Sequence, residues 1–298
     1  MQRPLRARGI LRLLRLQPVE DDFLDAALVL VGHGSSVDAE AAGPVWRHAE
    51  ALRRRGLFAQ VREAFWKQEP YVGQALRGLL HRRVFVVPIF ISEGYFTEEV
   101  IPRELGFCHP GETHFVRTQE RGGQVFHYCG PVGTHPSMTE VLLARVSEIV
   151  EQFPFPRAPK PGDTALFIAG HGTGNNENSR KAIEQHADII RDRRFYAEVH
   201  AVFIEEEPRI GDCSRLARAR NIVMVPFFIS DGPHASQDIP VMLGVPEQVA
   251  RERLKQGQPA WRNPTERGGK RIWYAASVGS EPRMAEVILE RVRQAARG

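Results

Sequence analysis

Cysteine is scarce in this sequence, and long apolar runs are missing. The three cysteines, Cys108, Cys129 and Cys213, show no C-x-x-C spacing. They give no signature of a zinc site or an iron–sulfur cluster, and such sparse usage predicts a reducing, cytoplasmic location. No apolar stretch approaches the roughly 18 residues that a membrane span needs, so we expect no membrane span. The apolar segment of a secretory signal is also missing.

A large charge of either sign is lacking as well. The 298 residues include 40 Lys and Arg against 36 Asp and Glu. The net charge of +4 is compatible with an acidic ligand but too small to indicate nucleic-acid binding. The length predicts two domains of ordinary globular composition. Residues 1–17 carry five arginines and no acid, which predicts a short basic helix packed on the domain rather than a transit peptide or membrane-surface helix.

The chain contains an internal duplication. Residues 28–34, LVLVGHG, recur 138 positions later (171 − 33) as residues 166–172, LFIAGHG. Further on, the spacing between matching motifs grows to 146 (266 − 120), because the second copy has gained eight residues after Gly244. Two more segments repeat at the first spacing: residues 69–70 as 207–208, and residues 84–94 as 222–232.

Between the copies, residues 153–162 hold four prolines, which predicts a stiff, extended connector. Each copy alternates apolar strands with helices, a pattern that predicts a parallel sheet with right-handed crossovers. We therefore expect two tandem flavodoxin-like α/β/α domains, each with a four-stranded parallel sheet. The predicted division is a basic N-terminal extension at 1–25, a first domain at 26–152, the linker at 153–162 and a second domain at 163–298. The predicted strands are 26–31, 60–66, 84–91, 125–129, 165–169, 197–204, 222–229 and 271–276, and the predicted helices are 40–55, 71–81, 98–105, 138–152, 179–192, 211–220 and 284–296. We expect Gly56 to cap the first of these helices and a polar loop to connect residue 105 to the strand at 125–129.

Two histidines of the second copy follow its first and third strands. His171 stands in a Gly-His-Gly turn, and His234 ends the run Ser230-Asp231-Gly232-Pro233-His234. The first and third strands are neighbours in a flavodoxin-like sheet, so both imidazoles should face one crevice at its carboxyl edge. Glu207 follows the second strand and can add a carboxylate, and this donor set suits Co²⁺, Fe²⁺ or Ni²⁺. We interpret Glu205 and Glu206 beside it as solvated charges.

The first copy keeps His33 and Glu69 but has Phe96 where the repeat predicts a histidine. A phenyl ring cannot bind a metal, so this copy is interpreted as a half-lost second site. The other histidines occupy no matching positions. We interpret His109, His114, His127 and His135 as surface residues, and His48, His81, His186 and His200 as structural ones.

These motifs together resemble those of the class II tetrapyrrole chelatases, and most nearly the sirohydrochlorin chelatases of the CbiX/SirB type. The resemblance covers residues 26–152 and 163–298. It rests on the GHG turn followed by Ser or Thr, the Glu-Pro pair, and PFFISDGPHASQDIP at residues 226–240. It implies a chelatase-like domain in each half, with a tetrapyrrole bound in the cleft between them. It further implies insertion of Co²⁺ or Fe²⁺ into sirohydrochlorin, for cobalamin or sirohaem synthesis.

The resemblance also implies roles for individual residues. His171 corresponds to the histidine that accepts protons and binds the metal, and His234 to the second metal ligand. Two-half members of the family generally keep the working pair in the first half, whereas here the intact pair is in the second. The positions that would contact the tetrapyrrole are Glu207, Ile229, Ser230, Asp231, Gly232, Pro233 and His234. Basic side chains that could attract its carboxylates are Arg262, Arg267, Lys270 and Arg271.

Two other functions fit the same residues. One is a non-catalytic carrier of metal or tetrapyrrole on a chelatase fold, and the other is a phosphoryl-transfer enzyme that uses a Gly-His-Gly histidine. The second lacks the arginine usually found beside a phosphate-handling histidine. We expect the divalent metal to be a substrate and no organic cofactor to be needed. The sequence does not choose among the metals and does not indicate an oligomeric state.

Overall fold

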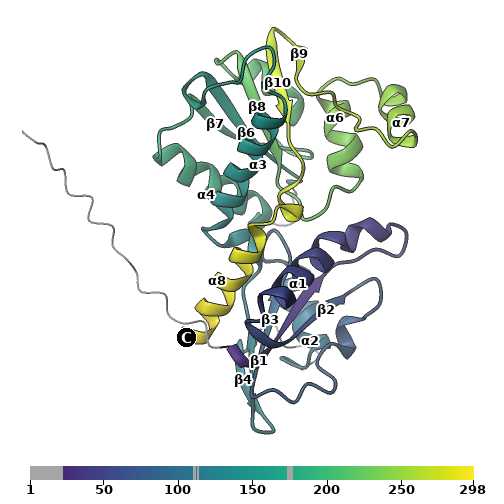
Figure 1. The fold of residues 1–298 in the computed structure, drawn as a ribbon, viewed down its shortest axis with the longest axis vertical. Helices are drawn as coiled ribbons and strands as arrows, with labels where there is room; N and C mark the ends of the chain where they lie inside the picture. Colours follow the sequence, from purple (N-terminus) through teal and green to yellow (C-terminus); the bar gives the residue numbers. More distant parts are fainter. Residues whose placement is uncertain (1–22, 110–111, 113, 173–176) are drawn as a thin grey trace, which may run out of the picture.

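Two five-stranded sheets of the same topology make up the protein (Figure 1). The computed structural model describes residues 23–109, 112, 114–172 and 177–298, without the side chains of residues 39 and 40. The basic helix predicted for residues 1–17 therefore lies outside the described residues. The strand orders are β2-β1-β3-β5-β4 and β7-β6-β8-β10-β9. The strands are β1 Phe23–Gly32, β2 Phe58–Phe65, β3 Arg83–Pro88, β4 Thr118–Arg121, β5 Gln124–Tyr128, β6 Thr164–Gly170, β7 Glu198–Phe203, β8 Asn221–Pro226, β9 Thr265–Arg267 and β10 Lys270–Tyr274.

The prediction of a duplicated flavodoxin-like α/β/α fold is confirmed, with one correction to the sheets. Four strands of each sheet run parallel, as expected. A fifth strand, β4 or β9, pairs antiparallel with the strand that follows it. The connecting glycines, Gly122–Gly123 and Gly268–Gly269, all have positive φ. Two consecutive residues of that conformation form the tight turn that suits a hairpin, so a segment predicted as a loop is an edge strand.

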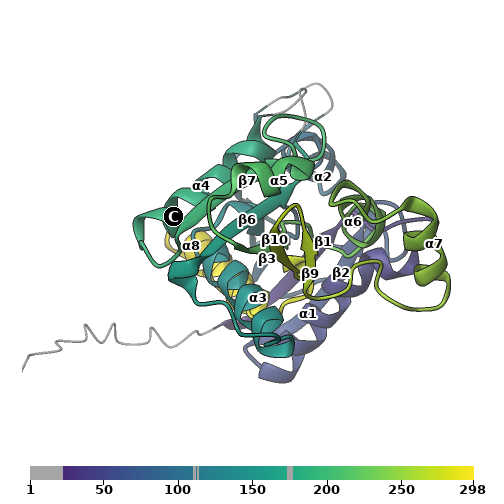
Figure 2. The same ribbon diagram turned by 90° about the horizontal axis from the view of Figure 1, so that it is seen from above.

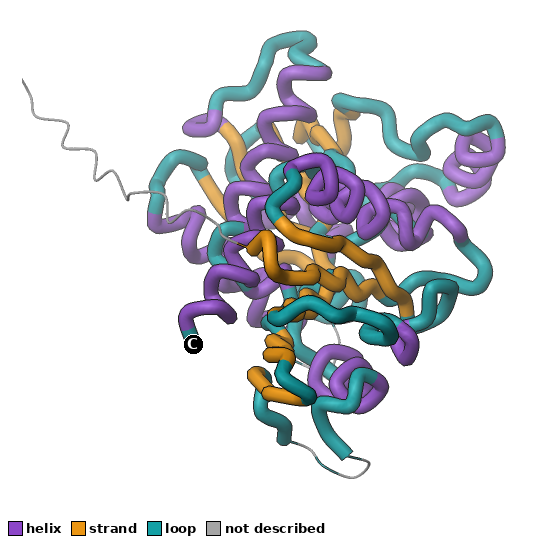
Figure 3. Tube along the Cα trace, turned by 60° about the horizontal axis from the view of Figure 1, so that its bottom comes forward, coloured by secondary structure: helices purple, strands orange, loops and turns teal. Residues whose placement is uncertain are grey.

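Helices cover both faces of the sheets (Figure 3). Residues 26–31 of β1 are completely buried, as a strand covered on both faces should be. The helix that follows it, α1, ends where Gly56 adopts φ 64°, which confirms the predicted glycine cap. The helices are α1 Gly43–Arg55, α2 Ile101–Glu104, α3 Met138–Gln152, α4 Asn178–Asp192, α5 Cys213–Leu216, α6 Ile239–Met242, α7 Glu247–Lys255 and α8 Met284–Arg297. None of those in the described part of the chain is long and apolar enough to cross a membrane.

One predicted helix is largely wrong, and another is too long. Residues 71–81 form only a short turn at Val72–Gln74, and Gly78 has φ 68°, a conformation that interrupts a right-handed helix. In the second copy, a 3₁₀ turn at Ile210–Asp212 and α5 form the helical part of the predicted range 211–220, and the helix ends at Leu216. There the Glu198 carboxylate accepts the backbone N–H groups of Arg218 and Ala219, so those amides are satisfied outside a helix. Helix α7, in the longer loop of the second copy, was not predicted.

The last helix of each repeat packs on the sheet of the other repeat. Helix α3 contacts β8 and β10, whereas α8 contacts β3, β5 and α1. The two helices also contact each other, and they overlap in Figure 2. Trp273 in β10 donates its indole N–H to the carbonyl of Phe153, directly after α3, at 2.9 Å. Arg55 and Glu286 pair across α1 and α8 at 2.5 Å. Each packed unit therefore combines the sheet of one repeat with the last helix of the other. Its composition differs in this helix from the sequence repeats at 26–152 and 163–298.

Three histidines are buried. His48 on α1 and His186 on α4 have 3% and 0% of their surface exposed, which agrees with their structural interpretation. Burial lowers the pKa of both imidazoles, because the charged form loses its hydration. His127 stacks on Phe85 with 4.7 Å between the ring centroids and is 9% exposed, so its interpretation as a surface residue is wrong.

Candidate functional site

The rings of His171 and His234 meet at the carboxyl edge of the second sheet. Their centroids are 5.0 Å apart and their planes lie at 83°. Strand order explains this proximity, because β6 and β8 pair in parallel up to Ala169 and Pro226. His171 directly follows β6, and His234 opens a wide helical turn, His234–Asp238, that continues into α6. The structure thus brings these two predicted site residues together.

Oxygen acceptors fix the orientation of both rings. Nδ1 of His171 lies 3.0 Å from the carbonyl oxygen of Gly172, and Nδ1 of His234 lies 2.7 Å from Oδ2 of Asp238. An oxygen at this distance keeps the proton of the neutral ring on Nδ1. Nε2 of each ring is then the basic nitrogen, available to a metal or to an incoming proton. A carboxylate behind a metal-binding histidine is a common arrangement.

Two carboxylates that support the site were missed by the sequence interpretation. Asp238 pairs with His234 four residues earlier, a spacing that brings side chains onto one face of a helical turn. Oε1 of Glu205 lies 3.7 Å from Nδ1 of His171. The parallel pairing of Gly170 with Phe203 places the residues that follow these strands side by side. The side chain of Glu205 is 52% exposed, as a solvated charge should be, but it lies beside the imidazole of His171.

Glu206 and Glu207 have different surroundings. Oε2 of Glu206 lies 3.0 Å from the Arg180 guanidinium, and its side chain is 26% exposed, so the interpretation of Glu206 as a solvated charge is wrong. Glu207 is 75% exposed and pairs with Arg209 at 3.5 Å. Within the described residues, no group of three or more His, Cys, Asp or Glu side chains is placed to hold a metal ion. The structure does not bring Glu207 to the histidine pair.

The first half repeats this geometry with a phenyl ring in place of one imidazole. His33 and Phe96 have ring centroids 4.9 Å apart and planes at 89°. Nδ1 of His33 donates to the carbonyl of Gly34 at 2.9 Å. Lys67 and Val100 occupy the positions that correspond to Glu205 and Asp238. The half-lost site has thus lost its carboxylates as well as its second histidine. Glu69 is exposed.

A cleft of about 500 Å³ lies between the two halves, beside the His234 ring of the second-half histidine pair. His33 and Lys67 line its first-half wall, and His234 lines the opposite wall. Asp231 does not line it, because its carboxylate accepts the backbone N–H of Ser277 at 2.7 Å. The other lining residues are Gly34, Ser35, Ser36, Val37, Asp38 and Ala41 from the first half, and Phe228, Ile229, Ser230, Gly232, Pro233 and Ala235 from the second.

The basic residues predicted to attract a carboxylate-rich ligand do not line this cleft. Lys270 donates to the carbonyls of Arg218 and Ala219. Arg271 pairs with Glu266 at 2.9 Å. The guanidinium of Arg267 lies against Gly244, and Arg262 lines a separate cavity beside α7. Of the described basic residues, Lys67 is the one on the cleft wall.

Comparison with known proteins supplies independent information. The model of the family described as CbiX matches residues 27–149 and again residues 165–295. A Halobacterium salinarum protein named "Probable sirohydrochlorin cobaltochelatase" is 42% identical over 279 residues, which cover 90% of this chain and 91% of that protein.

Two solved structures share the fold. DR2241 from Deinococcus radiodurans, described as a multi-domain protein with structural similarity to chelatases, superimposes with a TM-score of 0.70 at 33% identity. The match covers 89% of this chain but only 54% of DR2241. SirB from Bacillus subtilis, solved with Fe³⁺, superimposes with a TM-score of 0.63 at 16% identity, over 91% of this chain and 95% of SirB.

Proposed function

The chain belongs to the CbiX family, and on this basis we propose that it is a sirohydrochlorin chelatase, which inserts Co²⁺ or Fe²⁺ into a tetrapyrrole. The observation that carries the proposal is the pair of facing imidazoles, each with Nδ1 held by an oxygen acceptor. The cleft beside it is lined by both halves and has a volume typical of small-molecule sites. We assign the tetrapyrrole to this cleft and the reaction to the cytoplasm.

Metal insertion requires two operations that neutral imidazoles perform. The metal substrate must lose part of its hydration shell, and Nε2 of His171 and His234 can replace water ligands. The macrocycle must lose two pyrrole N–H protons as the metal–nitrogen bonds form. When the metal leaves the imidazoles, their nitrogens become free to accept those protons. Asp238 keeps the second ring oriented throughout, through its hydrogen bond to Nδ1.

Two nitrogen ligands suit a transfer site better than a storage site. A site that holds a metal permanently usually supplies more protein ligands, and the described residues provide no third one at the pair. We therefore give Glu207 no metal role. It remains a proposed contact of the tetrapyrrole, together with Ile229, Ser230, Gly232, Pro233 and His234. Asp231 belongs to the same stretch and holds its backbone.

The direct test is a spectrophotometric insertion assay with sirohydrochlorin and, separately, Co²⁺, Fe²⁺ and Ni²⁺. The wild-type protein should convert the absorption spectrum with at least one metal, whereas His171→Ala and His234→Ala should abolish the conversion. His81→Ala is the matched control, because within the described residues the side chain of His81 hydrogen-bonds only to Gln60, and the change should leave the rate unchanged. Full activity in both site variants would refute the assignment, and tight binding without insertion would favour a carrier.

A further inference from the structure

A turn at residues 277–280 holds the chain segment that leads to His234. Gly279 donates its backbone N–H to the carbonyl of Phe228 at 3.0 Å, and Ser277 donates its backbone N–H to Asp231 at 2.7 Å. Gly279 also lies so close that a Cβ there would be 1.9 Å from the carbonyl oxygen of Ile229. The turn therefore sets the backbone of residues 228–231, part of which forms the second-half wall of the cleft.

Two buried side chains from the first half of the sequence hold this turn in place. His48 on α1 donates from Nε2 to the carbonyl of Gly279 at 2.6 Å. Arg145 on α3 donates to the carbonyl of Ser277 at 3.0 Å and to the hydroxyl of Ser280 at 2.6 Å. His48 is 3% exposed and Arg145 is 5% exposed. In so dry an environment each hydrogen bond is difficult to replace with water.

His48 connects the two walls of the cleft. The segment of the first-half wall that begins at His33 ends at Ala41, just before α1 begins at Gly43, and His48 lies on that helix. The opposite wall is attached to the 277–280 turn. The bond from His48 to Gly279 thus sets how far the first-half wall stands from the loop that carries His234.

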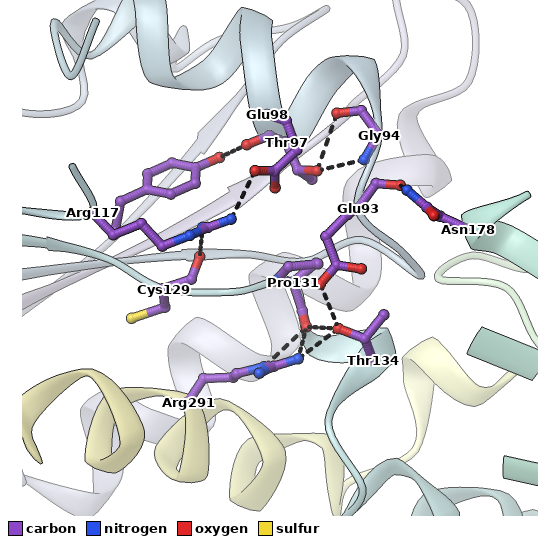
Figure 4. A network of polar contacts seen from close by, with 11 residues as sticks. Glu93, Gly94, Thr97, Glu98, Arg117, Cys129, Pro131, Thr134, Asn178 and Arg291 are labelled. Atoms are coloured by element: carbon purple, nitrogen blue, oxygen red, sulfur yellow. Dashed lines mark hydrogen bonds and ion pairs between the residues drawn. The ribbon is translucent and has the colours of Figure 1, made fainter. Parts of the chain in front are cut away.

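The duplication provides the same network around the half-lost site. His186 on α4 donates to the carbonyl of Gly133 at 2.7 Å, and Gly133 donates to the carbonyl of Phe90 at 2.9 Å. Arg291 on α8 donates to the carbonyl of Pro131 and to Thr134 (Figure 4). This copy holds the backbone that leads to Phe96, and residues 90–96 do not line the cleft.

We infer that His48 and Arg145 are positioning residues for the His171–His234 pair, whereas their counterparts His186 and Arg291 hold the backbone that leads to Phe96 and contribute to stability. The ring of His186 also packs on Phe227, with 5.2 Å between the centroids, and a leucine side chain can keep this apolar contact. The predicted effect on metal insertion rests on the proposed function. The predicted effect on metal binding does not, because metal binding is measurable without a tetrapyrrole. Two equivalent changes at similarly buried histidines should therefore have unequal effects on the site, although His186 has a second hydrogen-bond partner, the hydroxyl of Thr139 at 3.0 Å.

The test compares His48→Leu with His186→Leu. Each variant leaves one buried carbonyl without its donor, and His186→Leu also leaves the buried Thr139 hydroxyl without its partner. Both melting temperatures should therefore fall, that of His186→Leu at least as far as that of His48→Leu. His48→Leu should weaken Co²⁺ binding, followed by the visible absorption of the bound ion, by about tenfold or more, the effect typical of losing support behind a metal ligand. Its kcat/KM for insertion should fall in parallel. His186→Leu should change both quantities by no more than about twofold, as for sites remote from function.

His48→Gln separates positioning from packing, because its amide can donate to Gly279 in place of Nε2, and it should recover most of the Co²⁺ affinity. If His48→Leu does not fold, Arg145→Gln and Arg291→Gln make the same comparison. Equal losses in both members of a matched pair, or an unchanged Co²⁺ affinity in the first, would overturn the inference. A wild-type protein that binds Co²⁺ but inserts no metal would contradict the proposed function, while the Co²⁺ comparison would still decide the positioning role.

Discussion

The chemistry of the histidine pair depends on what lies behind each ring. A carboxylate oxygen stands 2.7 Å from Nδ1 of His234, and a second carboxylate lies 3.7 Å from Nδ1 of His171. Neither Asp238 nor Glu205 has an acidic counterpart in the first half. The sites of the two halves share the same arrangement of two rings but differ at three positions. The exchange of an imidazole for a phenyl ring is only one of these differences.

Replacing Asp238 with Ala should weaken Co²⁺ binding by about 10- to 100-fold, the effect usually found when the support of a metal-binding histidine is removed. The cause would be free rotation of the His234 ring and loss of its preferred tautomer. Calorimetric titration with Co²⁺ measures the change. Asp212→Ala is the control, because Asp212 pairs only with Arg215 among the described residues. Unchanged affinity in the Asp238 variant would show that the ring is oriented by other contacts.

Replacing Phe96 with His should create a second imidazole pair in the first half. The phenyl ring already lies 4.9 Å from the ring of His33, so the new imidazole would take the place that His234 occupies in the second half. Binding should be weaker than at the natural pair, because Lys67 stands where Glu205 would. Equilibrium dialysis should give one additional bound Co²⁺, held more tightly in Phe96→His/Lys67→Glu. Phe96→Leu should add none, and an unchanged stoichiometry in the double variant would contradict the prediction.

At the scale of elements, two turns carry glycines that no other residue can replace without movement. A Cβ at Gly133 or Gly279 would lie 1.9 Å from a carbonyl oxygen of the neighbouring loop. Both glycines also donate their N–H to that loop. The close approach therefore fixes two loops of the fold against their sheets, independently of whether the loop carries a histidine or a phenylalanine.

Gly133→Ala should lower the free energy of unfolding by about 1 to 3 kcal/mol, the usual cost of forcing a group into a filled space. Urea denaturation measures this loss. Gly162→Ala serves as the control, because a Cβ at Gly162 meets no atom within 4 Å and its φ is not positive. Equal midpoints for the two variants would mean that the 132–134 turn moves away at little cost.

At the scale of the whole molecule, neither repeat covers the whole of its own sheet, because α1 and α4 pack on their own sheets but α3 and α8 do not. Helix α3 buries Met138, Val141, Leu142 and Ile149 while it packs on the second sheet, and α8 does the same for the first. The two halves are therefore joined by exchanged helices and by the links from His48 and His186 as well as by residues 153–162. Separation of the halves would expose an apolar face on both.

A fragment of residues 1–152 should form a homodimer rather than a monomer. The helices α3 and α8 occupy equivalent positions in the repeat, so α3 of one copy can cover the first sheet of another. Light scattering after gel filtration should report twice the mass of the fragment. A fragment that ends at residue 137 lacks this helix and should aggregate. A folded, monodisperse monomer of residues 1–152 would show that α3 can fold back onto its own sheet.

Patterns in the sequence were sufficient to predict much of the fold and part of the site. The constant spacing between repeats predicted one fold twice, the continuous apolar runs predicted buried parallel strands, and the glycine after residue 55 ended α1 as expected. The motifs also predicted which residues stand at the carboxyl edge, and that position 96 had lost its histidine. These features depend on neighbours in sequence or on strand order, both of which the chain displays directly.

Tertiary structure alone decided the rest. An amphipathic helix shows which of its faces is buried but not which sheet covers it, and two sheets of the same repeat offer α3 equivalent surfaces. In the same way, the conformation of the loop after β7 directs Glu205 to His171 and leaves Glu207 paired with Arg209, although the three glutamates are consecutive. Sequence determined that two histidines and a carboxylate would gather at one edge, and only the folded loops decided which carboxylates reached them.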